Sequence, residues 1–504
     1  MDKPIINDET HKSKTRSIEI APGTRLEGHL KIPIFLDENG NVEAAYMQIV
    51  ELRGFEEFCK GRPVEEIPRI VTRLCGVCPW PHHIASSKVV DRVFGVEIPP
   101  AARQIKEIGY LAHILESHIE HFYALGPAPD FILGPSAPPE KRNIIGVIEA
   151  VGLEIGSLVI KNRGNAVRIE EIIGGKSTHP VFCVPGGISK PLTPEERIEI
   201  IAMTKELVEF SKFTLQIVHD VVLSNKEYVD LILSKDVYYH ETYYLGTVND
   251  EDNLDLYEGD LKIIDPTGKE VEKFKPENYL DYISEHVEPW TYLKFPVYKQ
   301  VGWNGLTDGI DSGIMRAAPL GRLNVIKGIP TPLAQESYEE YLSVLGGKPI
   351  HNTLAFHWAR AIEIQYAAER LLQLLEDDSI LSKEVRTIPD PAKFTGEGIG
   401  VIEAPRGTLI HHYVTDKNGM VTNLNLIVAS AFNHGGMCLS VEKAAKALIK
   451  NWQVSQGLLN KVEMAFRTYD PCLSCATHAF VGELPMEISL INPDGTIFKK
   501  IKRD

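Results

Sequence analysis

The pattern of apolar and polar residues changes character once, close to the N-terminus. From Ser17 to Val50 the two kinds of residue alternate around the turn Asn39-Gly40, which is typical of a β-hairpin. Beyond it, apolar residues recur at helical spacing over long stretches, one of which starts at a capping box formed by Thr193 and Glu196. The pattern predicts helices over residues 99–125, 136–175, 193–225, 353–378 and 440–469.

Strand patterns are short and lie mostly outside these helices. Residues 398–428 alternate as strands do, and residues 485–500 form a second candidate hairpin around Asn492-Pro-Asp-Gly495. Residues 250–310 mix short strands and turns, and no composition break marks a linker. We therefore predict a mainly α fold, with one large helical-bundle domain and small β regions at its N-terminal and C-terminal ends.

Composition narrows the classes of function. The chain has 504 residues, 43% of them hydrophobic, and a net charge of −16, so it would repel nucleic acid and anionic lipid surfaces. No apolar run is long enough to span a membrane, and the polar N-terminus lacks the apolar core of a signal peptide. Seven cysteines are too few for a disulfide scaffold. We expect a cytoplasmic protein that binds no nucleic acid.

Four of the cysteines form two C-x-x-C pairs at opposite ends of the chain. Cys75 and Cys78 stand in RLCGVCPWPHH, and Cys472 and Cys475 stand in DPCLSCATH. Each pair can aim two thiolates at one soft metal. Structural zinc usually joins pairs about 15–20 residues apart, and a thioredoxin-like dithiol follows a strand and opens a helix. Spacing alone leaves structural zinc, two separate dithiols and a redox metal open.

The neighbours of the two pairs favour a redox centre. Arg73 and His82 flank the first pair, and Asp470 and His478 flank the second. Arginine, aspartate and histidine suit a centre that moves protons and holds anionic ligands, and an inert zinc site needs none of them. Through the motifs R-x-C-G-x-C-x-x-x-H and D-P-C-x-x-C-x-x-H, the chain resembles the large subunit of nickel–iron hydrogenases, from RLEGH at 25–29 to His478.

The resemblance implies a nickel ion held by four thiolates and an iron that carries carbon monoxide and cyanide. Cys75 and Cys472 would be terminal nickel ligands, and Cys78 and Cys475 would bridge nickel to iron. Dihydrogen would be split heterolytically at this centre, and Cys472 would take the proton.

Five further residues match family positions around the centre. Glu27 would pass the proton outward with a raised pKa, although an isolated glutamate is more often a solvated side chain. His82 would hydrogen-bond a bridging cysteine. Arg406 would lie beside the open metal face and the cyanide ligands, paired with Asp470. Ser430 would donate a hydrogen bond to a second cyanide.

The segment GEGIGVIEAPRG at 396–407 also suggests a dinucleotide site. Its glycines run G-x-G-x-G rather than G-x-G-x-x-G, and Pro405 prevents a helix from opening after them. We therefore reject a phosphate cradle there.

Two positions depart from the family pattern. Ala429 stands where proline is frequent before Ser430, and Ser117 stands where the family has an aspartate. The second departure favours the soluble, cofactor-coupled branch of the family. Within that branch we favour the heterodisulfide-reductase-linked or viologen-reducing type. His113 and His121 share a helix face with Ser117, and we interpret them as a packed polar seam.

A second, harder metal is implied near the C-terminal motif. Glu56 and His478 match family ligands of magnesium or a similar divalent ion, and a backbone carbonyl near Asn423 would complete the protein side.

The remaining cysteines, Cys59, Cys183 and Cys438, form no iron–sulfur motif and are predicted to be buried hydrophobic residues. Electrons then have no exit within the chain. The resemblance implies a partner, an iron–sulfur small subunit that accepts the electrons. It also allows further electron-transfer subunits in the same complex.

The family also divides the chain after His478. Residues 1–478 would form the large-subunit domain, and residues 479–504 an extension that a maturation endopeptidase removes; the alternative is a permanent terminal hairpin. Two rival identities remain, a metal-free homologue from a respiratory complex and a structural zinc protein.

Overall fold

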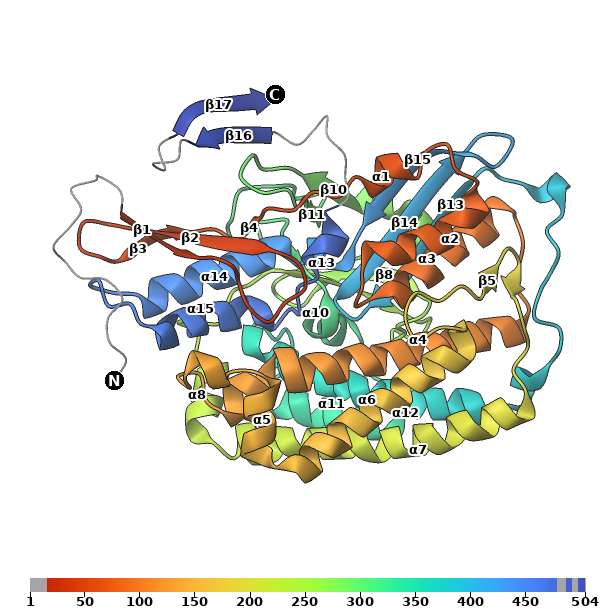
Figure 1. Cartoon of the computed structure of the whole chain (residues 1–504), viewed down its shortest axis with the longest axis horizontal. Coiled ribbons are helices and arrows are strands. Elements are labelled where there is room, and N and C mark those ends of the chain that lie inside the picture. The colour runs from red at the N-terminus through yellow and green to blue at the C-terminus, as the bar shows by residue number, and fades with distance from the viewer. Residues whose placement is uncertain (1–15, 478–485, 492–496, 504) are drawn as a thin grey trace.

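A layer of long helices forms one side of the molecule, and small sheets with shorter helices form the other (Figure 1). The computed structural model describes residues 16–477, 486–491 and 497–503. The long helices of this layer are α4 (Pro100–Glu120), α6 (Leu153–Gly174), α7 (Pro194–Ile217), α11 (Pro332–Leu345) and α12 (Phe356–Glu376). Three other long helices, α3 (Pro79–Val93), α14 (His434–Leu448) and α15 (Gln456–Arg467), lie on the side of the sheets (Figure 1). Helices dominate, as the sequence pattern predicts.

Shorter helices lie in both layers (Figure 1). They are α1 (Phe55–Phe58), α2 (Ile67–Ile70), α5 (Ile144–Val151), α8 (Lys226–Leu233), α9 (Tyr279–Tyr282), α10 (Ala318–Val325), α13 (Ala429–Phe432) and α16 (Leu473–Ala476). Helix α16 carries Cys475 of the C-terminal cysteine motif. Helix α13, which packs against α16, carries Ser430.

The strands form several small sheets. The N-terminal sheet contains β1 (Arg16–Ile20), β2 (Leu30–Leu36), β3 (Val42–Ala45) and β4 (Gln48–Ile49). A middle sheet has the order β12-β7-β8-β9, formed by Met315–Arg316, Tyr243–Val248, Asp260–Ile264 and Glu270–Phe274. Two-stranded ladders join β5 (Cys183–Val184) to β6 (Gly187–Ile188) and β10 (Ile283–His286) to β11 (Phe295–Tyr298).

Local sequence signals fix several of these elements. Thr193 and Glu196 form the predicted capping box at the start of α7. The predicted hairpin pairs Leu36 with Val42 across the turn that contains Gly40. At the C-terminal end, β16 (Met486–Ile491) pairs with β17 (Ile497–Arg503), and the predicted turn between them lies outside the described residues.

Two predicted helices are each broken in two. The stretch 136–175 is interrupted at Gly152, whose φ of 89° ends α5 before α6 begins. The stretch 440–469 is interrupted between α14 and α15, where Asn451 and Trp452 have φ angles of 51° and 63°. The prediction of continuous helices was wrong here because hydrophobic periodicity continues across a turn that reverses or redirects the chain.

The strands β13 (Glu397–Ala404), β14 (Gly407–Thr415) and β15 (Val421–Ile427) form the sheet that supports the functional site. Helix α3 packs directly on β13. A Cβ atom on Gly398 would lie 2.5 Å from the Val89 carbonyl oxygen, and one on Gly400 would lie 2.1 Å from the Ala85 carbonyl oxygen. The glycines of GEGIG therefore allow close helix–strand packing, which agrees with the rejection of a dinucleotide site.

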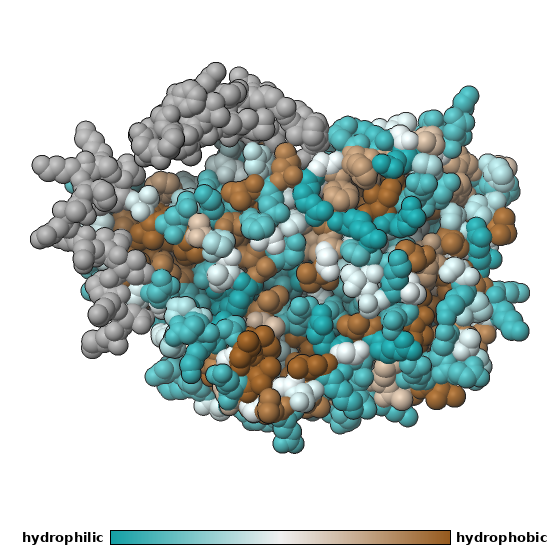
Figure 2. All heavy atoms as spheres, in the orientation of Figure 1, coloured by the Kyte–Doolittle hydropathy of each residue, from teal (hydrophilic) through white to brown (hydrophobic). Residues whose placement is uncertain are grey.

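Most large apolar side chains lie in the interior. Hydrophilic residues cover most of the face shown in Figure 2, broken by smaller apolar patches, and Ile145 and Leu153 are among the exposed apolar residues. Within the described part of the chain, none of the helices has the length and apolar character needed to cross a membrane.

Candidate metal centre

The first cysteine pair lies at the N-terminal end of α3. Cys75 follows a short 3-10 turn, and Cys78 is the residue immediately before the helix. The backbone N–H groups of Val77 and Cys78 donate to the Cys75 sulfur over 3.2 and 2.9 Å. This turn fixes the Cys75 side chain, and the positive end of α3 lies beside both sulfurs.

The second pair meets the first in the interior. The Sγ atoms of Cys75 and Cys472 lie 3.2 Å apart. Cys78 Sγ lies 3.7 Å from that of Cys472 and 3.4 Å from that of Cys475. All four thiols are free and buried, and their sulfurs lie within 4.8 Å of one another. The prediction that the two distant pairs form one cluster is confirmed, and two separate dithiols are excluded.

Burial disfavours ionisation of the four thiols. It raises the pKa of Cys472 and Cys475 well above the usual range. Burial also opposes ionisation of Cys75, but hydrogen bonds from its neighbours and the charge of Arg406 lower the pKa of that thiol. The cluster thus favours one thiolate and disfavours four, whereas a cation shared by all four sulfurs would stabilise every thiolate. This donor set fits a soft metal.

The segment around Glu27 pairs with the C-terminal motif as a short parallel bridge to Cys472. The Glu27 N–H donates to the Pro471 carbonyl oxygen over 3.2 Å, and the Leu473 N–H donates to the Glu27 carbonyl oxygen over 3.0 Å. The next residue, Gly28, has a φ of +91°, and a Cβ there would lie 2.8 Å from the Ser474 nitrogen. Glycine is therefore required for this close approach.

The Glu27 carboxylate lies directly on the cluster. The Cys472 thiol donates to its Oε2 atom over 3.2 Å, and the Ser474 N–H donates to the same oxygen over 3.1 Å. Burial, and then the negative charge of Cys75, raise the pKa of Glu27. The expected rise in its pKa is confirmed, and this carboxylate can exchange a proton with a thiol.

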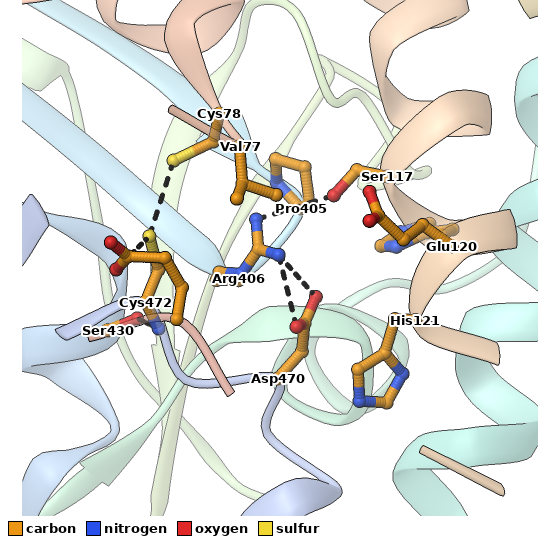
Figure 3. A network of polar contacts seen from close by, with 12 residues as sticks. Val77, Cys78, Ser117, Glu120, His121, Pro405, Arg406, Ser430, Asp470 and Cys472 are labelled. Carbon is orange, nitrogen blue, oxygen red and sulfur yellow. Dashed lines mark hydrogen bonds and ion pairs between the residues drawn. The ribbon is translucent and has the colours of Figure 1, made fainter. Parts of the chain in front are cut away.

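Arg406 reaches the cluster from the turn between β13 and β14, which consists of Pro405 and Arg406. Its Nη2 atom lies 3.0 Å from Asp470 Oδ2, and its Nη1 atom donates to Ser117 Oγ over 3.3 Å (Figure 3). Although burial opposes the charge, Asp470 and then Cys472 raise the pKa of Arg406 well above its usual value. The predicted Arg406–Asp470 pair is confirmed. The Nε atom has no hydrogen-bond partner among the described residues.

A small cavity separates Arg406 from the cluster. The Ser430 hydroxyl, at its edge, accepts the Cys472 N–H over 2.9 Å and can still donate its own proton. Most of the remaining wall is apolar. The lining residues are Cys78, Pro81, His82, Ala404, Pro405, Arg406, Leu409, Val428, Ala429, Ser430 and Cys472. A few fixed donors in an apolar wall fit small polar ligands next to the sulfurs.

His82 belongs to a buried polar chain that links α3 to β14. Its Nδ1 atom lies 3.1 Å from His411 Nε2, and His411 Nδ1 lies 2.6 Å from the Tyr413 hydroxyl. That hydroxyl donates to Ser86 Oγ over 2.9 Å. The sequence reasoning missed His411 and Tyr413, because strand alternation places them on one face but does not say which helix covers it. The hydrogen bond from His82 to a bridging cysteine stays a prediction.

The candidate site for a harder metal is only partly described. Glu56, on α1, accepts the Leu426 N–H over 3.0 Å, so β15 approaches it three residues beyond the Asn423 suggested by the sequence. His478 lies outside the described residues, as does the junction with residues 479–485.

Other residues singled out in the sequence lie outside the cysteine cluster. His113 faces Glu170 of α6 across 3.2 Å, and His121 Nε2 lies 2.8 Å from the Arg467 carbonyl oxygen, so both histidines pack against other elements as expected. Of the three cysteines outside the cluster, Cys59 and Cys438 are buried as expected, whereas Cys183 is half-buried because it lies on the short strand β5.

Comparison with known proteins assigns the family. The family described as nickel-dependent hydrogenase matches residues 53–137 and 310–478, and the family described as HoxL-like matches residues 17–52. The chain therefore belongs to the nickel-dependent hydrogenases. Within that family it is the catalytic large subunit, which makes it an oxidoreductase that acts on dihydrogen, and the respiratory homologue and the structural zinc protein are not favoured.

Individual relatives agree over nearly the whole length. The chain is 48% identical over 488 residues to one subunit of the F420-non-reducing hydrogenase of Archaeoglobus profundus, covering 97% of this chain and 99% of that protein. It is 36% identical over 503 residues to the NAD-reducing hydrogenase HoxS subunit beta of Cupriavidus necator, covering 97% of this chain and 100% of that protein. A solved structure of an NAD+-reducing [NiFe]-hydrogenase in the H2-reduced state superposes with a TM-score of 0.86 at 36% identity, covering 92% of this chain and 100% of the other. The cofactor-coupled branch suggested by Ser117 is confirmed.

Proposed function

We propose that this protein cleaves and forms dihydrogen heterolytically at a nickel–iron centre held by Cys75, Cys78, Cys472 and Cys475. The observation that carries this proposal is the meeting of four buried thiols from two distant motifs, with the Glu27 carboxylate 3.2 Å from one of them. When bound, the centre supplies a site that polarises dihydrogen and accepts its electrons. The protein supplies the proton acceptors and fixes the ligands.

The proton released from dihydrogen moves through Cys472 and Glu27. The Cys472 thiolate would accept the proton and become a thiol, and its hydrogen bond to Glu27 is the path by which the proton would leave. The raised pKa of Glu27 supports this role, because a carboxyl that titrates closer to neutral pH can both accept and release a proton. Arg406, held by Asp470, keeps positive charge beside the reacting face.

We infer that the iron carries carbon monoxide and cyanide in the cavity beside Arg406. Cyanide nitrogens accept hydrogen bonds, and the unpartnered Nε of Arg406 and the hydroxyl of Ser430 are the donors available there. Carbon monoxide is a poor acceptor and suits the apolar wall formed by residues such as Leu409 and Val428. Ala429 contributes to the same wall.

Glu56 and His478 are proposed ligands of a magnesium or similar divalent ion. The Glu56 carboxylate, which lies against β15, is the kind of oxygen donor that such an ion prefers.

We also propose that an endopeptidase cuts after His478 during maturation and removes residues 479–504. The short spacing between Cys475 and His478 supports the cut, because a bulky tail there would hinder closure of the C-terminal motif over the cluster.

We propose that electrons pass directly to an iron–sulfur small subunit, with further electron-transfer subunits behind it. Cys59, Cys183 and Cys438 are scattered and hold no cluster, so electrons must leave the chain. Relatives are named as F420-non-reducing and as NAD-reducing, which indicates that the final acceptor depends on the partner subunits. We place the complex in the cytoplasm, where seven unpaired cysteines stay reduced.

The test is to purify the complex without oxygen and measure metals, infrared bands and dihydrogen oxidation with a dye acceptor. We expect nickel and iron, bands of bound carbon monoxide and cyanide, and rapid dye reduction. Zinc alone would support a scaffold, and a complex free of metal would support the respiratory homologue.

A further inference from the structure

A second group of ionisable residues lies behind the cysteine loop, on helices α4 and α6. His113 Nδ1 lies 3.2 Å from Glu170 Oε1 and 3.7 Å from Glu116 Oε2. All three side chains are buried, and their nitrogen and oxygen atoms lie within 4.8 Å of one another. Buried carboxyls are rare unless they are paired or functional, and the nickel–iron site described above uses none of these residues.

The group is connected to the surface. Arg163 forms ion pairs with Glu116 and, over 3.1 Å, with Glu120. The exposed fraction of the side chain rises from 1% for His113 through 9% for Glu116 to 32% for Glu120. These residues line one wall of a polar cavity whose other wall includes Gly76, between the first two cysteines. The series therefore leads from the cysteine loop to the outside.

The group also lies near the metal centre. Ser117 lies one helical turn after His113 on α4, and it accepts a hydrogen bond from Arg406. Figure 3 shows Ser117 pointing toward Arg406 from the helix that also carries Glu120. The Nε2 atom of His113 has no hydrogen-bond partner among the described residues, although the side chain is almost fully buried. A water between these groups could serve it.

The surroundings hold protons on the carboxyls rather than on the imidazole. Burial raises the pKa of Glu170 well above its usual value and that of Glu116 to about 7. Burial lowers the pKa of His113 to about 4, with further effects of Glu116, Arg406 and Cys75. Arg163 and Glu120 are the other charged groups that face Glu116.

We propose, on the basis of the proposed function, that His113, Glu116 and Glu170 form a second proton route between the metal centre and solvent, separate from Glu27. His113 accepts a proton at Nε2 and releases one from Nδ1 to a carboxylate, so that its net charge is restored. Glu116 passes the proton to the half-buried Glu120, which shares the ion pair with Arg163. His113, Glu116 and Glu170 act at a distance from the reacting atoms and touch neither metal nor dihydrogen.

A divalent cation is the competing occupant of the same three residues. Arg163 already neutralises Glu116 and Glu120, and a cation would have to share the site with that guanidinium at close range. The geometry therefore favours proton transfer over metal binding. The test includes metal content so that this alternative is decided by the same experiment.

The experiment measures exchange of dihydrogen with deuterated water by the purified complex, in the wild type and in a Glu27→Gln background. We expect Glu27→Gln to retain residual exchange, and Glu170→Gln in that background to reduce the residual exchange by about a hundredfold with nickel unchanged. Glu154→Gln, an exposed substitution at the start of α6, is the matched control and should change nothing.

Glu116→Gln provides an independent readout if Glu170→Gln fails to fold. In the Glu27→Gln background, exchange should rise with pH around 7 as Glu116 loses its proton, and Glu116→Gln should abolish that rise. Unchanged residual exchange in both variants overturns the proposal, as does loss of one bound divalent ion in Glu170→Gln. Failure of the proposed function would be seen separately, as a wild-type complex without nickel or exchange.

Discussion

The Cys472 thiol donates a hydrogen bond to the Glu27 carboxylate over 3.2 Å, although 445 residues separate the two in the chain. The contact is held by one backbone bridge, made by two hydrogen bonds of Glu27 to the residues on either side of Cys472, so it does not depend on side-chain packing alone. The proposed nickel ligand and the proposed proton carrier are thereby kept next to each other, and the substitutions below separate their roles.

Replacing Glu27 with glutamine should block proton transfer through this carboxylate without removing the metal. The amide keeps the shape of the side chain but cannot titrate, so dihydrogen oxidation and isotope exchange should fall by about a hundredfold or more, while nickel content stays at the wild-type level. Glu51→Gln is a matched control, because Glu51 lies nearby and bonds His29 and Ser474 but not the cluster. Wild-type turnover in Glu27→Gln would refute the role of this residue.

Replacing Cys472 with serine should remove both activity and nickel. A hydroxyl is a hard, poorly ionised donor, so the four-sulfur set would be lost. Metal analysis and dye reduction on the purified complex measure the two effects together. Cys438→Ser, at a buried thiol outside the cluster, should keep both properties. An active, nickel-loaded Cys472→Ser enzyme would contradict the assignment.

Replacing Arg406 with lysine should leave the charge but remove the planar donor group. We expect activity to fall by about a hundredfold, the loss typical of an electrostatic donor, with nickel retained. The infrared bands of cyanide should shift, because the Nε donor in the cavity is lost, while the band of carbon monoxide should move less. Bands that are all unchanged would show that Arg406 does not contact the iron ligands.

Acid should destabilise the core around Glu363. Arg322 binds both oxygens of this buried carboxylate over 2.6 Å, and His118 lies 2.9 Å from it. Burial alone would raise the pKa of Glu363, but Arg322 lowers it to about 2, below the 4.5 of an ordinary glutamate. The stabilisation is complete above pH 4.5 and is lost as the pH falls toward 2.

Chemical unfolding at a series of pH values measures this effect. Glu363→Gln should weaken the pH dependence below 4.5, and at neutral pH it should lower the free energy of unfolding by about 3–5 kcal/mol, as expected for breaking a buried pair. Glu199→Gln, which removes an exposed ion pair with Arg168, should have an effect below about 1 kcal/mol. Equal effects from the two substitutions would rule out a special role for the buried pair.

The proposed cleavage after His478 is tested by the intact mass of the large subunit in active enzyme. We expect the chain to end at His478 and the full-length chain to contain little nickel. An active, nickel-loaded chain that still ends at Asp504 would show that residues 479–504 form a permanent hairpin.

The sequence predicted the parts of the site that depend on local motifs. The cysteine pairs, Glu27, Arg406 and Asp470 come together as expected, because each motif carries its own turn and the family resemblance supplies the pairing. The partners of His82 could not be predicted, since they come from a strand more than three hundred residues away. The break at Gly152 was missed because its φ angle of 89° cannot be read from the sequence. The residues around it are apolar, as they would be around a glycine inside a continuous helix.

The same limit applies to the buried carboxyls. Glu116 and Glu170 lie at ordinary helical positions, and nothing in either helix alone distinguishes them from solvated glutamates. Glu116 lies on α4 with His113, but only the packing of α4 against α6 brings Glu170 to them and buries the group.

The contact of α3 with β13 through Gly398 and Gly400 has a consequence for how this site can vary. Helix and strand already touch backbone to backbone, so every substitution at these glycines can only move them apart. The tolerance is one-sided: the distance between the Cys78 sulfur and the Arg406 guanidinium has a lower bound set by the van der Waals contact of the two backbones. Substitutions at these two glycines can therefore loosen the site but cannot tighten it.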